Sequence, residues 1–153
     1  MNRRTSAKPA KAPRKRAPSK TKASGAEERD DYVSKLAAAI SEVTAAQERW
    51  IAEVDAVSVR SGLMEDVTWQ VRYHAALESL LEAANRLRVE PVPDEMAAVD
   101  ETLRRAQAEA HMAADRHDDL SRSANRDSIV AAVRHLEHMG ELLMEAHAQV
   151  PRG

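Results

Sequence analysis

Apolar residues recur in steps of three and four over residues 27–61, the longest such segment of the chain. This spacing places them along one face of an α-helix, and its heptad form is typical of helices that pack side by side in a coiled coil. The seam consists of Val33, Leu36, Ile40, Val43, Gln47, Trp50, Val54 and Val57. The pattern predicts a helix over 27–61, with Gln47 as the one polar residue of its seam.

The same spacing predicts three further helices, over residues 64–88, 93–121 and 125–149. The second has a broad apolar face of Val67, Val71, His74, Leu77, Leu81 and Ala84, flanked by Tyr73, Leu80 and Leu87. The seam of the third is Met96, Val99, Leu103, Ala106, Ala110, Ala113, His117 and Leu120. The seam of the fourth is Ile129, Ala132, Leu136, Met139, Leu143, Ala146 and Val150. Small residues in the middle of the third seam would let a neighbouring helix approach closely.

Residues that end and begin helices occupy the breaks between these segments. Gly62 suits a C-terminal cap, Pro93 suits the first turn of the third helix, and Ser123 and Asn125 are N-cap candidates for the fourth. Four helices with short links predict an all-α fold, an antiparallel up-down four-helix bundle. The alternative is one continuous rod over residues 27–88 that pairs with another chain. Either arrangement leaves dimerisation open.

The composition excludes several kinds of site. The chain has two Trp, two Tyr and no Phe, and much of its apolar content is alanine, which suits closely packed helices better than sheets. The absence of cysteine excludes disulfides, thiolate metal sites and a cysteine nucleophile. No apolar run approaches the roughly 18 residues of a membrane-spanning helix. We therefore expect no membrane association.

The N-terminal residues do not resemble a targeting segment. They lack the apolar stretch of a secretory signal, and Pro9, Pro13 and Pro18 oppose the amphipathic helix of a mitochondrial transit peptide. Cytoplasmic location is therefore the expectation.

The charges divide the chain at Glu27. Residues 1–26 hold nine basic residues and no acid, whereas the other 14 basic residues (23 less 9) stand against all 25 acids, giving +9 and −11 within a net charge of −2. The nine are Arg3, Arg4, Lys8, Lys11, Arg14, Lys15, Arg16, Lys20 and Lys22. A proline-rich basic segment with almost no large apolar residue cannot bury enough surface to order itself. We expect a disordered tail over 1–26, followed by the bundle over 27–153.

The stretch KPAKAPRKRAPSKTK, residues 8–22, is similar in composition to the tails of linker histones and of some bacterial nucleoid-associated proteins. This resemblance implies binding to nucleic acid. Contacts made by a flexible basic tail go to phosphates and are largely blind to sequence. Two alternatives remain open: the tail pairs with acidic protein surface, either its own or a partner's, or it only keeps the protein soluble.

Six histidines prompt a search for a metal site in the bundle. The expected layout sets His111 opposite His135, one turn from His138, with His74 near Trp50. Their helical positions turn His111 and His138 to solvent, however, and leave His74, with His135 at the margin, facing inwards. No acid precedes any histidine by three residues, so the Glu-x-x-His pattern of di-iron bundles is absent. No metal site is predicted.

Catalytic motifs are also absent from the sequence. It has no glycine-rich phosphate loop and no Gly-x-Ser-x-Gly elbow. The acidic cluster at 115–119 lacks the glycine and the closing glutamate of a calcium loop. Glu137, Glu141 and Glu145 follow a four-residue spacing that indicates the outer face of the fourth helix. We expect a protein that is not an enzyme and needs no cofactor.

The expected function is therefore binding by a helical module. Its basic tail would bind nucleic acid or another polyanion without sequence specificity, and its bundle would form a homodimer or bind a protein partner, so that one assembly bridges strands. The alternative is a protein–protein adaptor or scaffold whose tail pairs with acidic protein surface. Exposure of Trp50 or Trp69 on an apolar patch would favour the alternative.

Overall fold

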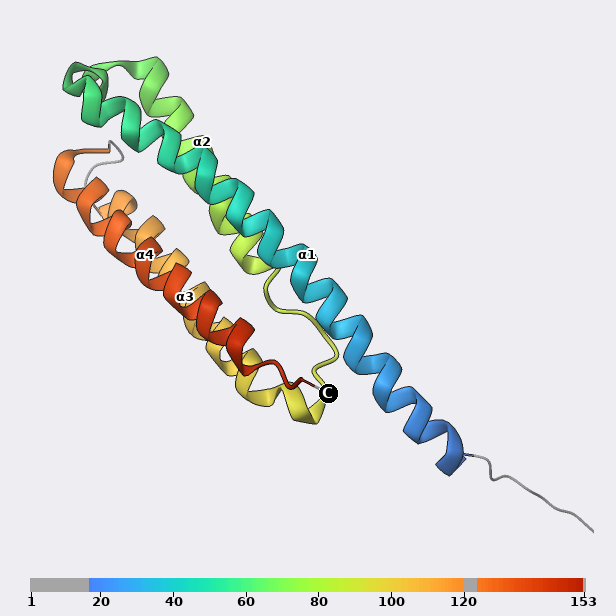
Figure 1. Ribbon diagram of the computed structural model, residues 1–153. Helices are drawn as coiled ribbons and strands as arrows, with labels where there is room; N and C mark the ends of the chain where they lie inside the picture. The colour runs from blue at the N-terminus through green and yellow to red at the C-terminus, as the bar shows by residue number, and fades with distance from the viewer. Residues whose placement is uncertain (1–16, 120–123, 153) are drawn as a thin grey trace, which may run out of the picture.

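The computed structural model describes residues 17–119 and 124–152, with side chains over 25–115 and 124–152. This part of the chain is all-helical, without strands (Figure 1). Four α-helices follow one another, with a short 3-10 helix ahead of the second and the third. Their bounds are α1 Ala17–Val59, η1 Ser61–Glu65, α2 Val67–Asn85, η2 Asp94–Met96, α3 Ala97–Asp119 and α4 Arg126–Gln149.

Helix α1 begins at Ala17, ten residues before its predicted start. Residues 17–26, which fall in the predicted tail, lie in α1, while residues 1–16 lie outside the described part. The reason is local, because Pro18 falls in the first turn, where no amide donor is needed. No further proline follows before residue 27, so the helix extends at little cost from the packed segment that nucleates it.

The break between the first two helices is confirmed, so no continuous rod forms. Helix α1 ends at Val59, and Gly62 lies inside η1. The predicted cap at Gly62 is wrong, since no described glycine has the positive φ of such a cap. Asp66 instead begins α2: its carboxylate accepts hydrogen bonds from the backbone N–H of Thr68 (2.8 Å) and of Trp69 (3.4 Å).

The predicted face of α2 is wrong at its N-terminal end. Val67 and Val71 are 77% and 64% exposed, whereas Trp69 and Tyr73 are fully buried. The Trp69 indole N–H donates to the backbone carbonyl of Glu53 (3.1 Å), and the ring centroids of Trp69 and Tyr73 lie 5.0 Å apart. Two large aromatic side chains bury more apolar area than two valines, so they determine which side of the helix turns inwards.

The predicted seams of α3 and α4 are confirmed over their described residues. In α3 the buried residues include Val99, Leu103, Ala106, Ala110 and Ala113, after Met96 in η2. In α4 they include Ile129, Ala132, Leu136, Met139, Leu143 and Ala146. Asn125 caps α4 in a reciprocal pair with Ser128. Ser123, Leu120 and the His117 side chain lie outside the described part.

Helices that are consecutive in sequence lie side by side: α1 with α2, α2 with α3, and α3 with α4. Ion pairs join the first two, Glu42 to Arg86 (3.1 Å) and Glu53 to Arg72 (3.2 Å). The backbones of α1 and α4, in contrast, make at most isolated close approaches. Figure 1 shows α3 and α4 running alongside the pair formed by α1 and α2, and α3 contacts α2.

Candidate functional site

Seven of the nine predicted nucleic-acid-binding residues lie outside the described part of the chain. They are Arg3, Arg4, Lys8, Lys11, Arg14, Lys15 and Arg16. Lys20 and Lys22 lie in α1, within the stretch whose side chains are not described. The structure therefore shows where residues 1–16 join the described part of the chain, which is the start of α1 at Ala17.

That attachment point is the end of a projecting helix. Figure 1 shows the N-terminal part of α1 running beyond the other helices. The first described contact of α1 with another helical segment is the ion pair of Arg29 with Glu95 (3.8 Å), followed by buried Tyr32. Glu27 and Glu28 are exposed. We call residues 17–28 the arm; at 1.5 Å per residue it is about 18 Å long.

The bundle beside the arm carries many exposed carboxylates. On α4, Glu137, Glu141 and Glu145 are exposed, as their spacing predicted, and so are Glu78 and Glu82 on α2. None of these five forms an ion pair with another described residue. Unpaired surface carboxylates repel phosphate and attract cations. The described surface thus complements the basic segment in charge.

Two of the histidines share one carboxylate, which sequence reasoning did not identify. Nδ1 of His135 lies 2.7 Å from Oε2 of Glu109, and Nδ1 of His138 lies 2.8 Å from Oε1. Burial would raise the pKa of Glu109, but the hydrogen bonds and positive charge of the two rings outweigh it and hold its pKa below the ordinary value. The contact fastens α4 to α3.

The other histidines lie as their helical positions predicted, with His111 exposed and His74 half-buried. His111 bonds through Nε2 to the side-chain oxygen of Asn85 (2.9 Å) and does not meet His135. The ring of His74 lies edge-on to Tyr73, with the centroids 5.7 Å apart. Within 25–115 and 124–152, no three histidines, aspartates or glutamates converge as they would around a metal ion.

The two tryptophans lie in the core and form no surface patch. Trp50 and Trp69 are 2% and 0% exposed, and both pack against Tyr73. Their exposure was the feature that would have favoured an adaptor, so that support is absent. Any apolar docking surface must be sought elsewhere.

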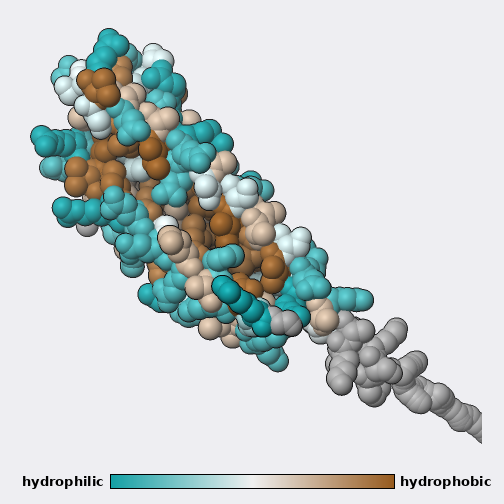
Figure 2. All heavy atoms as spheres, in the orientation of Figure 1, coloured by the Kyte–Doolittle hydropathy of each residue, from teal (hydrophilic) through white to brown (hydrophobic). Residues whose placement is uncertain are grey.

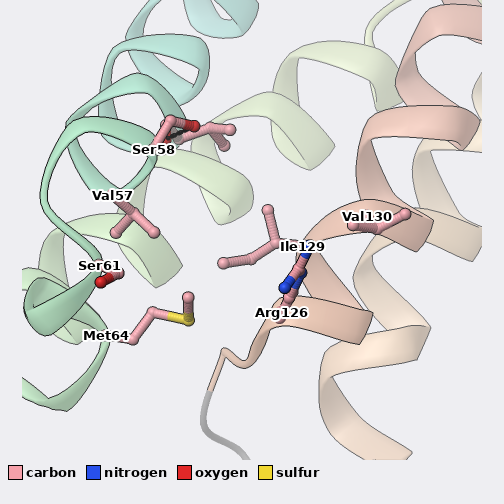
Figure 3. A pocket seen from close by; sticks show the side chains of 8 residues that line it. Val57, Ser58, Ser61, Met64, Arg126, Ile129 and Val130 are labelled. Atoms are coloured by element: carbon pink, nitrogen blue, oxygen red, sulfur yellow. Dashed lines mark hydrogen bonds between the residues drawn. The ribbon is translucent and has the colours of Figure 1, made fainter.

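An apolar surface does lie open between α1 and α4. Figure 2 shows hydrophobic side chains gathered in a band between these helices, with hydrophilic ones on both sides. At one end the band opens into a cavity of about 390 Å³, lined by Val54, Val57, Ser58, Ser61, Met64, Arg126, Ile129 and Val130. In Figure 3 Ile129 points across this cavity towards Val57 and Met64. We call the band the α1–α4 groove.

Comparison with known proteins identifies no relative of this chain. No known protein family, curated protein or solved structure matches it significantly. Within the described residues, every helix is too short or too polar to cross a bilayer.

Proposed function

We propose that this chain is a non-enzymatic helical module whose basic N-terminal segment binds nucleic acid or another polyanion without sequence specificity. The supporting observation is the separation of charge: nine basic residues and no acid in residues 1–26, against a remainder at −11. An acidic body does not hold phosphate, so contact must come from the segment beyond it. The protein acts in the cytoplasm and needs no cofactor or metal.

The length of the arm supports this proposal, because it holds the start of α1 away from the acidic bundle. Residues 1–16 continue from a helix whose end stands about 18 Å from the acidic bundle. At physiological ionic strength charges are screened over about 8 Å. The basic segment can therefore meet a polyanion while the repulsion from the bundle is largely screened.

The four helices form an antiparallel up-down bundle in this proposal. Cross-helix pairs support it: Glu42 meets Arg86, whereas Glu53, further along α1, meets Arg72, which comes earlier in α2. The same reversal relates α3 to α4, since Thr102 bonds to Gln149 and Glu109 to His135. The bundle provides the rigid body from which the segment extends.

A second candidate function is that of a protein–protein adaptor. The α1–α4 groove favours it, because a contiguous exposed apolar surface commonly marks a docking site. In that case the basic segment would pair with acidic protein surface, its own or a partner's. The two candidates differ in whether isolated nucleic acid binds.

The experiment that tests the proposal is fluorescence anisotropy of labelled duplex DNA and labelled single-stranded RNA. Three forms are compared: the full chain, the chain lacking residues 1–16, and a chain of full length whose seven basic residues before Ala17 are changed to Gln. The truncation stops at the start of α1, so the helical signal per molecule in circular dichroism should be preserved. The Gln variant keeps the length of the segment and removes seven of its nine basic residues.

Binding by the full chain and its loss in both variants would support phosphate binding by the segment. Equal affinity for duplexes of different sequence would support binding without sequence specificity. Undiminished binding by the truncated chain would overturn the proposal and place the contact on the bundle. No binding by the full chain at low salt would favour the adaptor.

A further inference from the structure

Helix α1 carries a second uncharged stripe beside the one it buries in the bundle. The predicted seam divides in two: Leu36, Val43 and Trp50 are buried, whereas the residues that alternate with them are half-buried. The half-buried column, at seven-residue spacing, is Val33, Ile40, Gln47 and Val54. A parallel column next to it is exposed and consists of Ala37, Thr44, Ile51 and Ser58. We call these two columns together the second stripe.

The second stripe can be buried with little loss of hydrogen bonding. The Thr44 hydroxyl donates to the carbonyl of Ile40 and the Ser58 hydroxyl to that of Val54, each at 3.0 Å. Both polar groups therefore already have partners within α1. Only the amide of Gln47, at the middle of the stripe, has no hydrogen-bond partner among the described residues. A buried amide without a partner is costly, so Gln47 constrains what can cover it.

The second stripe forms one wall of the α1–α4 groove. The cavity at one end joins Val54 and Ser58 to Arg126 and Val130 of α4. A second hollow at the other end joins Val33 to Val150. The groove therefore runs along most of the packed part of α1, and an occupant that filled it would be a long helix.

The wall on α4 leaves room for that helix. Val133 and Gly140 follow Arg126 at seven-residue spacing and so share its face. A Cβ added at Gly140 meets nothing within 4 Å. Met144, in the neighbouring column, is 75% exposed. Small residues at such a position let a second helix approach closely.

We propose that the occupant is helix α1 of a second copy of this chain, running antiparallel to the first, with Gln47 on the two-fold axis. In a two-fold interface each contact occurs twice, and only a residue on the axis meets itself. Gln47 is the midpoint between Val33 and Ser61 and between Ile40 and Val54. An amide both donates and accepts, so Gln47 can satisfy its counterpart. A single polar residue in an apolar seam fixes register in this way.

Charge favours the antiparallel direction over the parallel one. With Gln47 on the axis, the charged residues of this part of α1 lie level with small uncharged ones: Glu48 with Ala46, Asp55 with Ala39, and Glu42 with Ala52. A parallel pair would instead set each carboxylate level with its own copy. It would also bring the two basic segments, each with nine positive charges, together at one end, where they repel each other.

The antiparallel dimer sets the two basic segments far apart. From Ala17 of one copy to Ala17 of the other is 60 residues of helix rise, or about 90 Å. Such an assembly bridges two separate stretches of polyanion. The interface itself can be tested without any polyanion, so it and the proposed function can fail separately.

Single-cysteine variants test the interface, because the chain has no cysteine of its own. Purified full-length Gln47→Cys, Ile40→Cys and Val54→Cys are treated with a short bismaleimide and separated under denaturing conditions. We expect covalent dimers from Gln47→Cys, and from Ile40→Cys mixed with Val54→Cys, but few from either of these two alone. Dimers from Ile40→Cys alone, as abundant as from Gln47→Cys, would show a parallel pair and overturn the proposal. An absence of dimers from Gln47→Cys and from the mixture would also overturn it.

A variant in the opposite wall supplies an independent readout. Gly140→Arg adds bulk and charge to the groove at a helical position with open space, so the monomer should fold. Sedimentation equilibrium should show dimerisation weakened about tenfold or more, the effect of losing a central interface contact. The matched control is Ala108→Arg on the exposed face of α3, which should leave the dimer unchanged. Equal dimerisation by wild type and Gly140→Arg, or a wild-type chain that is monomeric at micromolar concentration, would contradict the interface.

Discussion

Oε2 of Glu109 lies 2.7 Å from Nδ1 of His135, so a carboxylate of α3 is hydrogen-bonded to an imidazole of α4. The other oxygen of Glu109 is bonded to His138, one turn further along α4. The Glu109 side chain is 13% exposed, which limits screening by water. These two bonds are a polar contact between helices whose shared core is largely alanine and leucine.

Removing the negative charge of Glu109 should weaken the bundle. Hydrogen bonds to charged groups contribute about 1.5–3 kcal/mol, so we expect Glu109→Gln to lower the free energy of unfolding by about that amount at pH 6. Urea denaturation followed by circular dichroism measures it. The control is Glu141→Gln on the exposed face of α4, which should change little. Equal stability of the two variants would show that the Glu109 contact contributes nothing.

The same residue predicts the acid dependence of stability. The pKa of Glu109 is lower in the folded chain than in the unfolded one, so the unfolded state binds more protons as the pH falls below about 4.5. Stability supplied by Glu109 is present above that pH and is lost as the pH falls through the folded pKa. Between pH 5 and pH 3 the free energy of unfolding should therefore fall less steeply for Glu109→Gln than for the wild type. Urea denaturation at each pH measures this.

Gln70 should be needed to hold the start of α4 against α2. Its amide nitrogen donates to the carbonyls of Met64 (2.7 Å) and Ala124 (3.0 Å), and its oxygen accepts from the N–H of Ala124 (2.9 Å). Ala124 is buried, so Gln70→Ala leaves polar backbone groups without partners, at a cost of about 1–3 kcal/mol. Thermal denaturation of this variant beside Glu78→Ala, an exposed residue of α2, tests the prediction. An equal loss of thermal stability in Gln70→Ala and Glu78→Ala would contradict the prediction.

The N-cap of α4 should make a smaller contribution. The side chain of Asn125 accepts from the N–H of Ser128 (2.9 Å), and the Ser128 hydroxyl accepts from the N–H of Asn125 (2.9 Å). Asn125→Ala should destabilise the protein by about 1 kcal/mol. Asn125→Ser keeps a capping oxygen and should recover most of that loss. If Asn125→Ser is as unstable as Asn125→Ala, Asn125 does not stabilise the protein by capping α4.

Ionisation of Tyr73 should unfold the protein at high pH. Burial raises the pKa of the Tyr73 hydroxyl above its ordinary value of about 10. The folded chain therefore holds this proton more tightly, and stability falls as the pH rises above about 10. Tyr73→Phe should lose less stability between pH 9 and pH 11 in urea denaturation. Burial raises the pKa of Tyr32 as well, so some decline should remain. An identical decline in both proteins would contradict the prediction.

Spacing predicted α3 and α4 well because their buried residues lie on one continuous apolar stripe. Met139 and Leu136, for example, lie inwards as the three- and four-residue steps require. Spacing failed where two apolar stripes compete on one helix. In α2 the valines at 67 and 71 fit the pattern, but the aromatic group of Trp69 and Tyr73 decides the orientation.

The spacing of apolar residues along the chain does not predict which side chains of different helices meet. His135 and His138 are three residues apart and so share a face, but their partner Glu109 depends on the relative height of α3 and α4. The layout that set His111 opposite His135 did not identify Asn85 of α2 as the partner of His111. The start of α1 was also missed, because composition indicates whether a segment can fold alone and not whether a packed helix extends into it.

The salt dependence of duplex DNA binding tests the central claim most directly. With nine basic residues, the slope of log affinity against log salt concentration should approach about −8 for the full chain. The chain lacking residues 1–16 keeps Lys20 and Lys22 in that region and should show a slope near −2. These two slopes would identify the segment as the phosphate-binding element. Equal slopes for the two proteins, or affinity independent of salt, would contradict the account.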